Sequence, residues 1–77
     1  MQENQSGAAT GLSIGVGTDH AGVEMKNRIY EHLRAQGIDA RNFGADSTEP
    51  SDYPEIAIRI AAAVASGEID RGILVCG

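Results

Sequence analysis

The chain has 77 residues and a net charge of −5, and 42% of its residues are hydrophobic while 22% are charged. This composition is typical of a globular protein with one small domain. Because the sequence has no basic cluster, nucleic acid and anionic membranes are not expected as partners, and its single cysteine excludes an intramolecular disulfide.

The first eleven residues are small and polar without a hydrophobic period, which predicts a disordered tail over residues 1–11. They have neither the basic nor the apolar region of a signal peptide. The longest apolar stretch, residues 56–65, is interrupted by Arg59 and is too short to span a bilayer. The sequence therefore predicts a soluble, cytoplasmic protein.

A strand and a helix are predicted next. The short apolar run over residues 12–17 predicts a strand that ends at a pair of glycines. Residues 22–36 have the period of a helix, since Met25, Ile29 and Leu33 recur four residues apart.

Local signals mark the exposed side and the end of this helix. Glu24 and Arg28 have the spacing of an i,i+4 ion pair, and Gly37 is expected to end the helix. Residues 38–43 then alternate between apolar and polar side chains, which predicts a half-buried strand, and residues 44–51 form a turn-rich loop.

A second helix is predicted near residues 54–66. Asp52 is a candidate N-cap with Glu55 three residues later, and Ser66 with Gly67 ends the helix. Its predicted apolar face consists of Ile56, Ile60, Ala63 and Val64.

The last element is an apolar run over residues 72–76, which predicts a strand that is covered on both faces. The order β-α-β-α-β predicts an α/β fold with a parallel sheet and helices packed on it. Ligands of such sheets bind beyond the carboxyl ends of the strands. Asp19 and His20 follow the first strand, and Cys76 ends the third.

The segment GVGTDHAG, residues 15–22, matches neither the dinucleotide fingerprint nor the P-loop, because its glycines are misplaced and no lysine follows. Two interpretations of its polar residues are open. Asp19 and His20 could contact an anion at the start of the helix, where N–H groups and the helix dipole favour negative charge. Alternatively, Asp19 caps the helix and His20 is a surface residue.

Other candidate groups have simpler interpretations. His32 is expected on the surface. Asp46, Glu49 and Asp52 share one loop but lack a metal-ligand spacing, so a solvated loop is expected, with no metal. Cys76 is either a buried small hydrophobic residue or, if its surroundings favour the thiolate, a general base.

Three segments resemble the ribose-5-phosphate isomerase B family, which also includes the subunits of galactose-6-phosphate isomerase. They are IGVGTDHAGVEMK (14–26), NFGADSTEPSDYP (42–54) and VASGEIDRGILVCG (64–77). The resemblance implies a Rossmann-like three-layer α/β/α sandwich that is a homodimer or tetramer, without metal or cofactor. It also implies the strand order 2-1-3, with the helices on opposite faces of the sheet.

The family interconverts aldose and ketose phosphates through a cis-enediolate, as in ribose 5-phosphate to ribulose 5-phosphate in the pentose phosphate pathway. By this resemblance, Cys76 is the base that moves a proton between C2 and C1. Asp19 and His20 contact the sugar phosphate, and the backbone from Gly77 begins the loop that stabilises the enediolate.

The resemblance covers only the first half of the family's domain, so residues 12–77 are expected to be a part that is truncated after the third strand. The family's anion-hole loop and later phosphate-binding residues have no counterpart here. Two alternatives to an active isomerase therefore stay open. The chain is an inactive fragment of such an enzyme, or it is a non-catalytic α/β interaction module.

Overall fold

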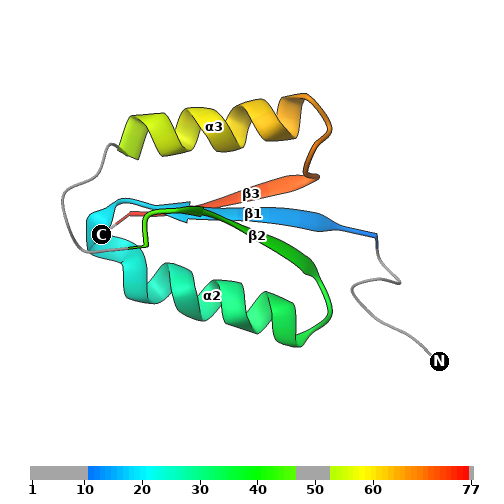
Figure 1. Cartoon of the computed structure of the whole chain (residues 1–77), viewed down its shortest axis with the longest axis horizontal. Coiled ribbons are helices and arrows are strands. Elements are labelled where there is room, and N and C mark those ends of the chain that lie inside the picture. The colour runs from blue at the N-terminus through cyan, green and yellow to red at the C-terminus, as the bar shows by residue number, and fades with distance from the viewer. Residues whose placement is uncertain (1–10, 47–52, 77) are drawn as a thin grey trace.

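Three parallel strands form one sheet with a helix on each face (Figure 1). The computed structural model describes residues 11–46 and 53–76. The strands are β1 (Ser13–Thr18), β2 (Asp39–Gly44) and β3 (Arg71–Val75). Their spatial order is β2-β1-β3, so β1 is the central strand. This confirms the predicted strand order.

The helices α2 (Val23–Ala35) and α3 (Tyr53–Ala65) lie on opposite faces of the sheet, as expected (Figure 1). A 3-10 turn, η1 (His20–Gly22), joins β1 to α2. Gly37 after α2 and Gly67 after α3 have φ angles of 79° and 83°, a left-handed conformation that glycine adopts without strain. Both helix ends therefore lie where the sequence predicts them. No helix in the described part of the chain is long and apolar enough to cross a membrane.

The main hydrophobic core lies between α3 and the sheet. It contains Ile56, Ile60, Ala63 and Ile69. Three of these were predicted for the apolar face of α3, whereas the fourth predicted member, Val64, is 38% exposed. The candidate N-cap Asp52 and the tail over residues 1–10 lie outside the described residues.

Glycines in β1 leave room for apolar side chains that pack on the sheet. A Cβ atom added to Gly15 would lie 2.6 Å from Cδ1 of Ile69, and one added to Gly17 would lie 2.7 Å from Cδ1 of Ile60. Real side chains do not approach this closely. Gly17 therefore lets Ile60 of α3 pack against the strand, while Gly15 makes room for Ile69, which follows the helix.

The apolar period of α2 matches the face that packs on the sheet only in part, and Ile29 and Leu33 are half-buried. Val23 and Lys26 are buried, while Met25 is 55% exposed. The sequence pattern counted only apolar residues, but the long aliphatic stem of a lysine can lie against a core as well.

The expectation that β3 is covered on both faces is wrong for this chain. None of its residues is fully buried, and Leu74 is 41% exposed. The reason is its place in the sheet, because among the described strands β3 pairs only with β1 and forms an edge. The strand also ends at Val75, so Cys76 lies just beyond it.

Candidate functional site

The carboxyl ends of β1 and β3 lie side by side. In the parallel ladder between them, Thr18 and Val75 form the last register pair. Asp19 and Cys76 each follow directly after this pair, and His20 begins η1. The structure therefore brings all three predicted site residues to one edge of the sheet. Gly77, predicted to bind substrate, lies outside the described residues.

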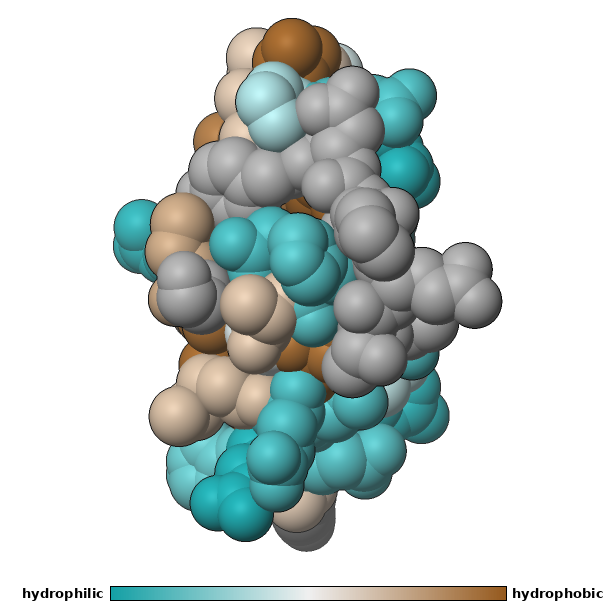
Figure 2. All heavy atoms as spheres, turned by 90° about the vertical axis from the view of Figure 1, so that its left-hand side faces the viewer, coloured by the Kyte–Doolittle hydropathy of each residue, from teal (hydrophilic) through white to brown (hydrophobic). Residues whose placement is uncertain are grey.

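Figure 2 looks onto this edge, where hydrophilic and hydrophobic residues both reach the surface. His20 and Cys76 are exposed, and the Cys76 thiol is not in a disulfide. Groups at this edge are therefore accessible to a small molecule from solvent.

Asp19 caps the turn that follows it. Its Oδ1 atom accepts hydrogen bonds from the backbone N–H of Ala21, at 3.1 Å, and of Gly22, at 3.0 Å. Asp19 therefore caps the 3-10 turn, whereas the N-cap of α2 itself is Gly22, which has no side-chain cap bond. These two N–H groups bind the Asp19 carboxylate, so the expectation that they are free to bind an anion is wrong for them. The same bonds fix the position of the carboxylate at the edge of the sheet.

Thr18 is a buried polar residue that sequence reasoning missed. Its side chain has no exposed surface, and its Oγ1 donates a hydrogen bond of 2.8 Å to the carbonyl oxygen of Val75. Its own carbonyl oxygen accepts a bond of 3.1 Å from the N–H of Ala45. The only signal in the sequence is a hydroxyl group at the end of an apolar strand.

Lys26 is a second buried polar residue that was missed. Its Nζ donates hydrogen bonds to Oδ1 of Asn42, at 3.0 Å, and to Oδ1 of Asp46, at 2.8 Å. Asn42 in turn donates to Asp46 at 2.7 Å and accepts from the N–H of Gly44 at 2.9 Å. These bonds fix the segment after β2, and those to the carboxylate lower the pKa of Asp46, with Lys26 the largest cause.

The other candidate groups give no metal site in the described residues. Asp46 is paired with Lys26, while Glu49 and Asp52 lie outside the described part of the chain. No group of three or more histidine, cysteine or acidic side chains in that part could hold a metal ion. His32 is exposed, as expected.

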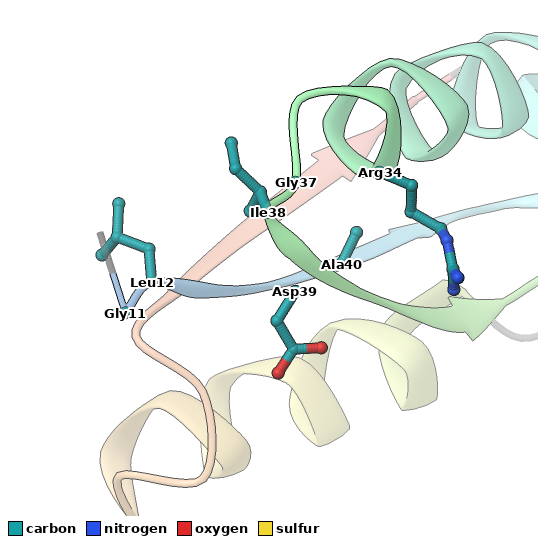
Figure 3. A pocket seen from close by; sticks show the side chains of 7 residues that line it. All are labelled: Gly11, Leu12, Arg34, Gly37, Ile38, Asp39 and Ala40. Carbon is teal, nitrogen blue, oxygen red and sulfur yellow. The ribbon is translucent and has the colours of Figure 1, made fainter. Parts of the chain in front are cut away.

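A cavity of about 470 Å³ lies at the opposite end of the sheet (Figure 3). It is lined by Gly11, Leu12, Arg34, Gly37, Ile38, Asp39 and Ala40. These residues surround the start of β1 and β2, so the cavity is separate from the edge that carries Asp19 and Cys76.

Comparison with known proteins gives one consistent result. The family model described as Ribose/Galactose Isomerase matches residues 14–77. The chain is 45% identical over 64 residues to ribose-5-phosphate isomerase B of Escherichia coli, covering 83% of this chain and 43% of that protein. It is 39% identical over 67 residues to the D-erythrulose-4-phosphate isomerase of Pectobacterium atrosepticum, covering 86% and 44%.

A solved structure has the same fold over the shared part. The ribose-5-phosphate isomerase B of Clostridium thermocellum superposes with a TM-score of 0.83 at 42% identity, covering 86% of this chain and 45% of that chain. The chain therefore spans less than half the length of these relatives.

Proposed function

This chain belongs to the Ribose/Galactose Isomerase family, and from that premise we propose that it carries part of the site of a sugar-phosphate isomerase. The proposed reaction is the conversion of ribose 5-phosphate to ribulose 5-phosphate. The observation that supports this most is the register pair Thr18 and Val75, which places Asp19 and Cys76 on adjacent strand ends. Neighbouring strands lie about 4.8 Å apart, so both side chains can reach one small ligand.

In the proposed mechanism, Cys76 acts as the base. Its thiolate takes the proton from C2 of the open-chain aldose. The electrons of the C–H bond form the C1–C2 double bond, and the π electrons of the C1 carbonyl move to O1 to give a cis-enediolate. The thiol then returns the proton to C1, while the O2 proton passes to O1 and the electrons that it leaves on O2 form the C2 carbonyl of the ketose. Asp19, held by its bonds to the η1 turn, and the exposed His20 contact the sugar phosphate.

The family resemblance assigns the groups that stabilise the enediolate to a loop that begins at Gly77, and we propose that turnover needs this loop. Removing one donor of this kind typically lowers the rate about 10²- to 10³-fold. We therefore expect the 77-residue chain alone to be inactive. We propose that a full-length member of the family is a homodimer or tetramer, which sedimentation of the joined form described below can test.

The test compares two forms of the chain. One is the chain of 77 residues, and the other is this chain joined to the segment of the E. coli relative that the match does not cover. Ribulose 5-phosphate formation is measured in a coupled assay, with galactose 6-phosphate and D-erythrulose 4-phosphate as competing substrates. Only the joined form should be active, with the highest kcat/KM on ribose 5-phosphate.

Cys76→Ala in the joined form should lower kcat at least about 10²-fold, the usual contribution of a positioned base, and leave sugar-phosphate binding intact. Ser66→Ala is the matched control, because it removes a hydroxyl group far from the edge, at the end of α3. Full activity of Cys76→Ala would refute the role of the base. Inactivity of the joined form on all three sugars would refute the proposed reaction.

A further inference from the structure

We propose that Thr18 is a positioning residue that sets where Cys76 and Asp19 stand at the carboxyl edge of the sheet. This rests on the proposed function, since it matters for catalysis only if Cys76 is the base. Thr18 does not touch the substrate in this proposal. It acts through the two peptide groups that lead into the site residues.

The first of these peptide groups joins Val75 to Cys76. A peptide unit is planar, so its carbonyl oxygen, its N–H and the Cα atom of the next residue move together. Oγ1 of Thr18 holds the carbonyl oxygen of Val75 at 2.8 Å. This bond therefore fixes the plane that carries the Cα atom of Cys76.

The second peptide group joins Thr18 to Asp19. Its carbonyl oxygen accepts the hydrogen bond of 3.1 Å from the N–H of Ala45, which follows β2. The plane that carries the Cα atom of Asp19 is fixed in the same way. Thr18 therefore links the ends of all three strands, and its two hydrogen bonds couple the positions of Asp19 and Cys76.

The residues around the Thr18 hydroxyl group leave room for its hydrogen bond to Val75 and exclude water from it. Thr18 has no exposed surface, and a buried hydroxyl group that lost its partner would carry a desolvation cost. Gly22 provides the space, because a Cβ atom there would lie 2.3 Å from Oγ1 of Thr18 and 2.9 Å from Cγ1 of Val75. A side chain at position 22 would displace the group that holds the end of β3.

The bond adds a side-chain attachment to a strand end that is paired on one side only. Among the described strands β3 pairs only with β1, so the segment that carries Cys76 is held from one side. A displacement of about 1 Å at a reacting group can lower a rate about 10²-fold. Loss of the hydroxyl group is therefore expected to affect proton transfer more than binding.

The catalytic test uses the joined form, in which the 77-residue chain is extended by the segment of the E. coli relative. Thr18→Val keeps the shape and the backbone carbonyl of Thr18 but removes the donor. We expect kcat to fall about 10- to 100-fold, with KM changed less than about threefold, because the plane before Asp19 keeps its bond to Ala45. Thr18→Ser keeps the hydroxyl group and should retain most of kcat. Ser66→Ala, which removes another hydroxyl bond to a backbone carbonyl, should change neither constant.

Gly22→Ala perturbs the same bond from the other side and provides a second variant if Thr18→Val does not fold. Gly22→Ala should lower kcat. Its effect should be smaller in a chain that already carries Thr18→Ala, because that substitution removes the hydroxyl group that the new Cβ atom meets. Additive losses of Gly22→Ala and Thr18→Ala would show that the two residues do not act on one bond.

Hydrogen exchange in the 77-residue chain gives a readout that does not depend on activity. Thr18→Val should raise the exchange rates of the amides at the carboxyl end of the β1–β3 ladder, around the Thr18–Val75 register pair, but leave the middle of the ladder unchanged. A purely structural role would instead lower protection along the whole ladder. That outcome, or an unchanged kcat in Thr18→Val, overturns the proposal. If the parent joined form does not isomerise but exchange changes locally, the proposed function fails while the positioning role stands.

Discussion

The ammonium group of Lys26, which has no exposed surface, lies 2.8 Å from a carboxylate oxygen of Asp46, which is 74% exposed. This ion pair joins the first turn of α2 to the segment after β2. A second acceptor, Asn42, shares the ammonium group at 3.0 Å. The buried ammonium group of Lys26 therefore attaches α2 both to β2, through Asn42, and to the segment after β2, through Asp46.

The stability of the chain should depend on the protonation of Asp46. Its pKa is lowered by hydrogen bonds from Lys26 and Asn42. A carboxylate with a lowered folded-state pKa stabilises the fold above its unfolded pKa of about 3.9, and this contribution is lost as the pH falls through the folded-state pKa. We expect the free energy of unfolding to fall over this acidic range, modestly because solvent screens an exposed carboxylate.

Urea unfolding between pH 2 and pH 7 measures this dependence. Asp46→Asn should reduce the acid-dependent loss. Glu24→Gln removes the same charge from the exposed pair with Arg28 and serves as the control. If Asp46→Asn and the parent chain lose equal amounts of stability as the pH falls, the Lys26–Asp46 ion pair does not contribute to the acid dependence of the free energy of unfolding.

The stem and the charge of Lys26 should contribute differently to stability. Lys26→Ala leaves a cavity under α2 and should cost about 2–4 kcal/mol, in the range found when other long side chains are truncated in a core. Lys26→Met keeps most of the stem, and it leaves Asn42 and Asp46 where water can solvate them. Its cost should be below about 1.5 kcal/mol, because replacing a buried ion by an apolar group of similar size is often nearly neutral. Equal losses in chemical denaturation would contradict this division.

Gly15→Ala should destabilise the chain by overpacking, by about 1–3 kcal/mol. The new Cβ atom would lie 2.6 Å from Cδ1 of Ile69 and 2.8 Å from Cε1 of Phe43. Ile69→Val removes the Cδ1 atom, so the double variant should lose less than the sum of the two single losses. Thermal unfolding of all four proteins measures this coupling, and strict additivity would mean that the contact is relieved elsewhere.

The exposed edge of β3 should promote self-association of the 77-residue chain. Edge strands with unpaired backbone groups and apolar side chains pair readily with other chains. Leu74→Lys places a charge on this edge and should shift the chain towards the monomer in sedimentation experiments. Ile58→Lys is the control, because Ile58 is an even more exposed residue, at 67%, on α3. A similar shift in both variants would indicate general solubility rather than strand pairing.

The elements of this fold could be predicted because their signals are local. The spacing of the hydrophobic residues predicted the two helices, and the glycines that follow them predicted where each helix ends. The strand order came from the family resemblance, since no local pattern specifies which strand is central. Exposure of β3 could not be predicted from its composition, because Ile73 and Leu74 have the same character whether or not another strand covers them.

The residues missed at the site depend on distant partners. The hydroxyl group of Thr18 is satisfied by Val75, 57 positions later in the chain. Lys26 is satisfied by residues 16 and 20 positions later. In sequence, neither residue stands out from the polar residues beside it, Asp19 and Asn27, and only the three-dimensional structure distinguishes it from a surface residue.

Side chains hold the β1–β3 ladder at both of its ends. Oδ2 of Asp70 accepts a bond of 2.9 Å from the N–H of Ser13 at the start, and Thr18 binds Val75 at the finish. If β3 slipped by one residue along β1, Cys76 would move by about 3.3 Å and turn to the other face of the sheet. Both terminal bonds would break together. A misaligned chain therefore loses both bonds at once, which favours the register that places the thiol beside Asp19.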